Sequence, residues 1–298
     1  MTSTTFTMPG ADLDLADGPA IADVLHLAAE YNRQDPLRKG ASVHLPAEGR
    51  LLMTGDLHDN TLGLTRIVKH ARLDRKPTNR LVLHEIIHGP NRVNGMDLSI
   101  RTLARCCAVK CAYPEQVYML LSNHELAQRR QEHVFKDSSS DVEAFNLGLE
   151  HLYANDAKQV NAAFEDYVDS LLLAVRCANG VFCSHSLPAP RDIEGFDKSV
   201  IDRDLTELDN QINGSAHNMV WGRHQNIQLC RELMQAWDCK VFLVGHQPAE
   251  MGHEELWDDI LILNSDHSHA VCLPINLKKS YTRDELSALA VPLNAIPL

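Results

Sequence analysis

The sequence has no excess of basic residues. Its 298 residues include 28 Lys and Arg against 40 Asp and Glu, which gives a formal net charge of -12. A nucleic-acid-binding surface normally shows a basic patch, so we expect no such surface here. An acidic protein can still bind anionic phosphate where bound metal ions supply the positive charge.

Long apolar runs are lacking as well. No segment approaches the roughly 20 apolar residues of a membrane span, and residues 1–17 have neither the basic nor the apolar region of a signal peptide. The eight cysteines are scattered and form no C-x-x-C pair. This favours reduced core residues over disulfides or zinc ligands. We therefore predict a cytoplasmic protein that does not contact a membrane.

Short apolar segments with the length of strands alternate with helical patterns. The predicted strands lie at residues 42–45, 50–55, 80–83, 116–121, 180–183, 240–244, 260–263 and 270–277. Helices are predicted at 19–34, 61–71, 97–110 and 224–237, and residues 142–176 are predicted to be mostly helix in two or three pieces. This alternation predicts an α/β fold with helices layered on one or two sheets.

Potential metal ligands follow five of these strands. The chain carries 16 histidines, and the informative ones come directly after apolar segments, together with acidic and amide residues: Asp56, His58, Glu85, Asn123, His124, His185 and His246. Carboxylate, amide oxygen and imidazole suit Mn, Fe or Zn. Two such ions about 3.5–4 Å apart can clamp a phosphoryl group and generate a hydroxide near neutral pH.

The order of these residues resembles the calcineurin-like metallophosphoesterases, whose motifs run GDxH, GDxxDRG, GNHE, a His after a buried strand, and GH. The sequence is most similar to the branch that contains the protein serine/threonine phosphatases. Residues 99–125 resemble that branch's helix, Tyr-Pro-Glu turn and strand before GNHE, and residues 181–188 are similar to its FCxHGGLxP segment. The likeness covers roughly residues 50–277.

The resemblance implies a four-layer α/β/β/α sandwich of two mixed sheets, with a dinuclear metal centre at the strand ends. Residues 1–40 are then expected to form an N-terminal arm and helix. Residues 41–298 would form a single metallophosphoesterase domain, with a helical insertion at about 126–176 and a loop region at about 187–220. The number of subunits does not follow from the residues.

Carried over position by position, the resemblance also implies roles for individual residues. One metal would be held by Asp56 and His58, and the other by Asn123, His185 and His246, with Glu85 bridging the two. His124 would protonate the leaving oxygen, and Arg223 is a candidate phosphate clamp. The implied function is metal-dependent phosphoester hydrolysis by a hydroxide bound to both metals. The substrate would be a phosphomonoester, either a phosphorylated small molecule or a phosphoprotein.

The second motif departs from the family pattern. Where the family has Gly-Asp this chain has His84-Glu85, and where it has Asp-Arg this chain has His88-Gly89. His88 stands at the position of the aspartate that orients the catalytic histidine, so it is a candidate catalytic-site residue of altered chemistry. Arg92 is a candidate replacement for the absent arginine. The departure leaves open a non-catalytic, metal-binding role as a scaffold or sensor.

The altered motif is also a literal HExxH, from His84 to His88. In zinc metalloproteases a helix places both histidines on one face and the glutamate acts as general base. The apolar strand before His84 and the Gly89-Pro90 pair after His88 argue against a helix here. A zinc metalloprotease is therefore the third alternative.

Overall fold

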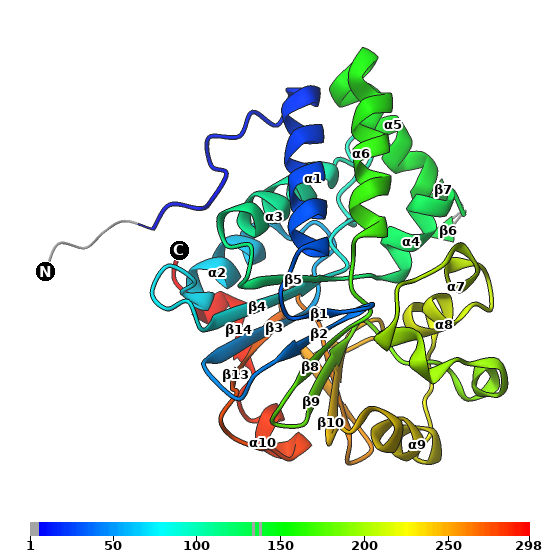
Figure 1. The fold of residues 1–298 in the computed structure, drawn as a ribbon. Coiled ribbons are helices and arrows are strands. Elements are labelled where there is room, and N and C mark those ends of the chain that lie inside the picture. Colours follow the sequence, from blue (N-terminus) through cyan, green and yellow to red (C-terminus); the bar gives the residue numbers. More distant parts are fainter. Residues whose placement is uncertain (1–5, 133–134, 137–138) are drawn as a thin grey trace, which may run out of the picture.

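The structure, a computed structural model, describes residues 6–132, 135–136 and 139–298 (Figure 1). The helices are α1 Gly18–Arg33, α2 Thr61–Ala71, α3 Ile100–Ala112, α4 Asn123–Arg130, α5 Asp141–Tyr153, α6 Ala157–Asp169, α7 Glu207–Asn210, α8 Ser215–Trp221, α9 Ile227–Trp237 and α10 Arg283–Ser287. The strands are β1 Arg38–Lys39, β2 Ser42–Leu45, β3 Arg50–Asp56, β4 Asn79–His84, β5 Val117–Leu120, β6 Phe135–Lys136, β7 Ser139–Ser140, β8 Ala174–Cys177, β9 Val181–Ser184, β10 Val241–Val244, β11 His253–Leu256, β12 Ile260–Leu263, β13 Val271–Asn276 and β14 Val291–Pro292.

Most of the strands form two mixed sheets. One has the order β1-β2-β8-β9-β10-β12-β11 and the other β14-β13-β3-β4-β5. Strands β3, β4 and β5 are parallel to one another, as are β9, β10 and β12. The carboxyl ends of parallel neighbours lie at one edge of a sheet, so each sheet brings several chain segments to a common edge.

The two sheets pack face to face, and the side-chain alternation of the strands explains why. On β3, Leu51 and Met53 belong to the apolar cluster between the sheets, whereas Leu52 belongs to the cluster under the helices. On β10, Leu243 likewise faces the other sheet and Phe242 faces the helices. Because successive side chains point to opposite faces, an entirely apolar strand is buried on both sides.

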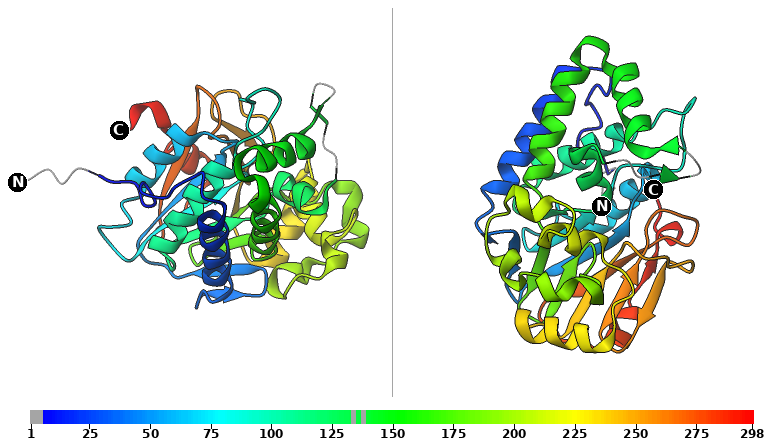
Figure 2. Two further views of the ribbon diagram at one scale, coloured as in Figure 1. Left: turned by 90° about the horizontal axis from the view of Figure 1, so that it is seen from above. Right: turned by 90° about the vertical axis from the view of Figure 1, so that its right-hand side faces the viewer.

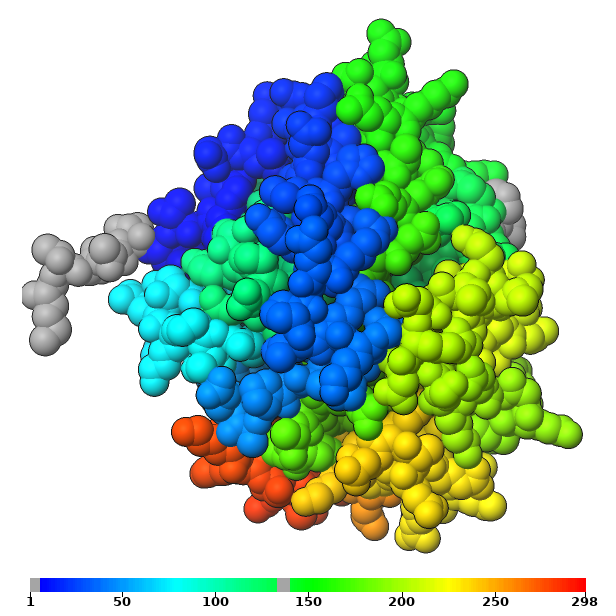
Figure 3. Space-filling view, in the orientation of Figure 1, coloured from blue at the N-terminus to red at the C-terminus, as the bar shows by residue number. Residues whose placement is uncertain are grey.

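Helices cover the outer faces of both sheets (Figure 2). Helices α2 and α3 contact β3, β4 and β5, while the Trp237 ring of α9 stacks on Phe182 of β9 with centroids 4.8 Å apart. Helix α1 begins after Asp17, whose carboxylate accepts from the Ala20 N–H. It lies beside α6 on the face seen in Figure 3. The architecture is therefore the predicted α/β/β/α sandwich.

The structure confirms most of the predicted elements and corrects others. The strands at 42–45 and 260–263 and the helix at 61–71 have the predicted bounds. The helical prediction for 142–176 is wrong at its end, because residues 174–177 form β8, which pairs with β2 and β9. Of the expected N-terminal arm, residues 1–5 lie outside the described part. No helix among the described residues is long and apolar enough to cross a bilayer.

Candidate metal centre

The strand ends that carry the predicted ligands meet at one place. Asp56 ends β3 and His84 ends β4, and the two residues are partners across the parallel ladder after a register shift. An isolated bridge pairs Asp56 with Asn264, which links this edge to the segment that follows β12 of the other sheet. The loops that carry the predicted metal ligands of the two sheets therefore lie next to each other.

Hydrogen bonds from the backbone hold these loops together. The Glu85 carbonyl accepts from the N–H groups of Leu57 and His58, both at 2.9 Å. The buried Glu125 carboxylate accepts from the N–H groups of Ile86 at 2.8 Å and Ile87 at 3.3 Å. The loop after β4 is thus tied both to the loop after β3 and to helix α4.

Several residues of the candidate site have left-handed backbone conformations. The φ angles of His58, Glu85, His88 and His246 are +40°, +47°, +60° and +64°. Such conformations are unfavourable for residues with a Cβ, and they persist where the surroundings determine them. Their concentration here indicates that the loops are shaped to aim particular side chains.

The two oxygens of the Glu85 carboxylate face different groups. Oε1 lies 3.7 Å from His58 Nε2 and 3.5 Å from His124 Nε2, whereas Oε2 lies 3.4 Å from His185 Nε2. Asn123 adds its amide oxygen 2.8 Å from the same nitrogen of His185. Glu85 is 2% exposed. A carboxylate with ligand groups on both sides is suited to bridge two cations.

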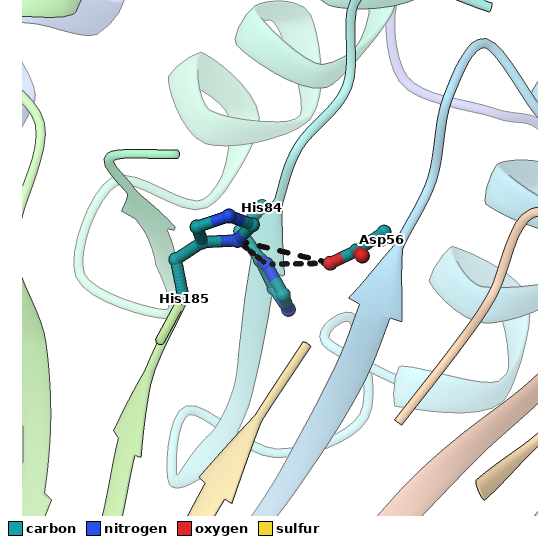
Figure 4. A group of neighbouring side chains, drawn as sticks. All are labelled: Asp56, His84 and His185. Atoms are coloured by element: carbon teal, nitrogen blue, oxygen red, sulfur yellow. Dashed lines mark hydrogen bonds and ion pairs between the residues drawn. The ribbon is translucent and has the colours of Figure 1, made fainter. Parts of the chain in front are cut away.

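A further group joins Asp56 to two histidines (Figure 4). His84 Nδ1 lies 3.4 Å and His185 Nδ1 lies 3.7 Å from Asp56 Oδ1. The Asp56 carboxylate also accepts from the His246 N–H at 2.8 Å. Gly245 makes this arrangement sterically feasible, because a Cβ there would collide with Asp56 Oδ1 and lie 2.6 Å from His84 Cε1.

His88 contacts His124 directly, and Arg92 is paired with an aspartate that also lies near His124. His88 Nδ1 lies 2.8 Å from His124 Nδ1, and its Nε2 lies 3.1 Å from Gln128 Oε1. Asp141, the first residue of α5, approaches His124 Nδ1 to 3.9 Å. Arg92 forms an ion pair with that aspartate.

Arg223 reaches the centre from the exposed loop after α8. Its Nε donates to His246 Nε2 at 2.9 Å. The guanidinium therefore lies beside a predicted metal ligand, where an anion held at the centre would meet it. This placement is compatible with the clamp role that the resemblance implies.

The protonation states of the buried groups suit bound metal ions. Burial raises the pKa of Asp56 to about 7 and lowers the pKa of His84 to about 4. Burial and the nearby Arg223 lower the pKa of His246 to about 3. Burial thus keeps the imidazoles of His84 and His246 neutral, which is the form that binds a divalent cation, and it disfavours a charged Asp56 carboxylate unless a cation lies beside it. Among the residues that the structure describes, four groups have donor atoms mutually within 4.8 Å: Asp56, His84 and His185; His58, Glu85 and His124; Glu85, His185 and His246; and His88, His124 and Asp141.

The HExxH segment is not helical, which removes the geometric basis of the protease alternative. His84 is the last residue of β4, and Glu85 and His88 have positive φ. The two histidines meet different partners, His185 and His124. The zinc-protease arrangement, with both histidines on one helix face, is therefore absent from the described loop.

Sequence reasoning missed two residues that contact the site. Gln128 lies four residues after His124 on helix α4, whose start at Asn123 was not predicted, since the helical insertion was expected only from about residue 126. The Ser-x-x-Glu pattern from Ser122 to Glu125 is a capping signal that could have revealed it, since the Ser122 hydroxyl caps α4. Asp141 arrives from a separate helix, and its spacing from the motifs contains no signal.

Comparisons with known proteins agree with the fold. No protein-family model matches the sequence, and no curated protein matches it significantly. Among solved structures, the chain is similar to a protein serine/threonine phosphatase from Saccharomyces cerevisiae with similarity to human phosphatase PP5. The TM-score is 0.64 at 13% identity, covering 87% of this chain and 82% of that one.

A cold-active protein-tyrosine phosphatase of a psychrophile, Shewanella sp., matches with a TM-score of 0.54 at 12% identity, covering 84% of this chain and 80% of that one. A second structure of a cold-active protein tyrosine phosphatase matches with a TM-score of 0.51 at 11% identity, covering 88% of this chain and 84% of that one. Identities this low show the fold alone. The chain therefore has the fold of the serine/threonine phosphatase and carries groups of potential metal ligands where its strands end.

Proposed function

We propose that this protein is a metal-dependent phosphoester hydrolase that acts on phosphomonoesters. The observation that carries the proposal is the Glu85 carboxylate, whose two oxygens face separate sets of ligands. Asp56 and His58 would hold one ion, and Asn123, His185 and His246 the other. Mn, Fe and Zn all suit these donors.

The chain's own residues would bind and orient the phosphoryl group. Two bound ions would supply positive charge for the phosphoryl oxygens and lower the pKa of a water so that it can attack phosphorus. Arg223, next to His246, would bind an equatorial oxygen through its planar guanidinium. The resemblance assigns the proton donor to His124, whose Nε2 faces Glu85. A phosphorylated small molecule and a phosphoprotein are both consistent with these groups.

A test combines metal content with turnover. The purified protein is analysed for metals per subunit and assayed with Mn²⁺ on p-nitrophenyl phosphate and a panel of other phosphoesters. We expect about two ions and metal-dependent hydrolysis. Asp56→Asn should lose at least about tenfold in metal affinity and most of the activity, because it removes a ligand charge. Asp23→Asn, on the exposed face of α1, is the matched control and should behave like the wild type.

The competing scaffold or sensor role predicts a different result. Two bound ions without turnover on the whole panel would refute the hydrolase and favour a binding role. Neither ions nor turnover in the wild type would refute both.

A further inference from the structure

Two pairs of histidines share an unusual geometry. The Nδ1 atoms of His84 and His185 are 3.0 Å apart, and those of His88 and His124 are 2.8 Å apart. At these distances each pair forms one hydrogen bond, so one ring donates a proton and the other accepts it. Both HExxH histidines thus contact a histidine of another motif.

In each pair, the contact made by Nε2 of the HExxH histidine shows which ring donates the hydrogen bond between the two Nδ1 atoms. His84 Nε2 lies 3.0 Å from the carbonyl of Thr54, which can only accept, so Nε2 carries the proton. His88 Nε2 lies 3.1 Å from Gln128 Oε1, which also accepts, because the Gln128 amide nitrogen donates to Asn146 Oδ1 at 2.8 Å. A neutral imidazole has one N–H, so Nδ1 of both rings accepts.

It follows that His185 and His124 donate through Nδ1 and have no proton on Nε2. All four rings are buried, with exposed fractions of 1–6%. Burial disfavours an additional positive charge in either pair.

The unprotonated nitrogens face oxygens that also accept. His185 Nε2 lies 2.8 Å from Asn123 Oδ1 and 3.4 Å from Glu85 Oε2. His124 Nε2 lies 3.5 Å from Glu85 Oε1, on the same side as His58. Nitrogen and oxygen lone pairs that converge in this way can bind one cation together, as in the group of His58, Glu85 and His124, and a metal-bound histidine usually donates its other N–H to a fixed acceptor.

We propose that His84 and His88 are positioning residues that hold His185 and His124 with an unprotonated Nε2, and that His124 joins His58 and Glu85 as a ligand of one metal ion. This inference rests on the proposed hydrolase and changes the role that the resemblance gives His124. A nitrogen that binds metal has no proton for the leaving group. The site therefore suits substrates whose leaving group needs none, such as aryl phosphates, over alkyl esters such as phosphoserine.

The ligand assignment is tested by metal binding, independently of turnover. Chelator-treated protein is titrated with Co²⁺, and the ligand-field absorption and the ions bound per subunit are recorded. We expect two ions in the wild type. We expect His124→Ala to lose at least about tenfold in affinity for one ion, with a changed spectrum. His26→Ala, an exposed histidine on α1, is the control and should match the wild type.

Two substitutions at His88 separate positioning from packing. His88→Leu removes the acceptor for His124 Nδ1–H, and we expect affinity for that ion to fall about 10- to 100-fold. His88→Gln keeps an amide oxygen as acceptor and should stay within a few-fold of the wild type. Equal losses in both variants, or unchanged binding and spectrum in His124→Ala, would overturn the inference.

Hydrolysis rates give a second readout. We expect them to fall steeply from p-nitrophenyl phosphate to phenyl phosphate to phosphoserine, because each leaving group is more basic than the one before. Equal rates on all three would indicate a working proton donor and contradict the ligand role of His124. Two bound ions without turnover in the wild type, together with the expected loss of one ion in His124→Ala, would refute the proposed hydrolase and support the ligand assignment.

Discussion

Lys110 offers a sharp test of the buried electrostatics that support the site. It lies at the end of α3, is 1% exposed, and donates to the carbonyls of Pro114 at 2.7 Å and Val117 at 2.9 Å. These bonds hold the turn into β5, the strand that leads to Asn123. Burial lowers the pKa of Lys110 to about 8, partly offset by Asp35 at 4.0 Å.

The lowered pKa of Lys110 determines whether folding stability rises or falls with pH. Between about pH 8 and 10.5 the unfolded chain keeps the Lys110 proton while the folded chain has lost it, so stability rises with pH. The gain is lost again as pH falls through this window to 8. From about pH 7.5 to 9.5 we expect the wild type to gain about 2 kcal/mol in unfolding free energy relative to Lys110→Met, on the basis of linkage at about 1.36 kcal/mol per pKa unit.

Urea unfolding of both proteins at the two pH values measures this difference. Subtracting the variant cancels the titration of tyrosines and cysteines that do not interact with Lys110, and burial raises the pKa of the neighbouring Cys111 thiol to about 11, above this range. Lys158→Met, an exposed lysine of α6, is the control and should show almost no relative pH dependence. Parallel pH profiles for the wild type and Lys110→Met would refute the reasoning.

Three further predictions follow from particular contacts. Gly245→Ala should weaken metal binding at least about tenfold, because the added Cβ would displace Asp56 and His84. Elemental analysis checks this prediction. Gly195→Ala is the control, because a Cβ there meets nothing within 4 Å. Trp237→Ala should cost about 3–5 kcal/mol in urea unfolding through loss of the buried stack on Phe182, and a cost below about 1 kcal/mol would contradict the packing. Removing metals with a chelator should lower the melting temperature, and Mn²⁺ at about 100 times its Kd should restore about 2.7 kcal/mol per ion; an unchanged melting temperature would argue against metal ions at this centre.

Local patterns predicted the parts of the fold that local forces determine. The strand at 50–55 and the helix at 61–71 carry their own periodicity and capping residue, Asn60, and both appear in the structure. Residues 171–176 begin with an apolar run that suits a buried helix or a strand equally well. Pairing with β2, which lies far earlier in the chain, and with β9, the next strand, decides for a strand. The pairing with β2 has no signature within the segment itself.

The candidate site likewise has features that local sequence predicts and features that depend on packing. Asp56, Glu85, His124 and His185 were predicted as site residues because each comes at or just after the end of an apolar strand, and parallel strands end together. The pairing of His84 with His185 could not be read from the sequence, since it depends on a space beside Gly245, from another strand end. Likewise, Asp141 reaches His124 only through the packing of α5.

The altered second motif changes the electrostatics around His124 more than its position. An aspartate at residue 88 would stabilise a protonated His124, since an adjacent anion favours the imidazolium. His88 offers a neutral acceptor at 2.8 Å instead. The carboxylate of Asp141 is close, at 3.9 Å, but it is paired with the guanidinium of Arg92, which offsets its charge. Because a neutral His124 donates its one proton to His88, its Nε2 lone pair faces Glu85 and can bind a cation there. The same substitution that removes the expected proton donor therefore supplies an additional ligand.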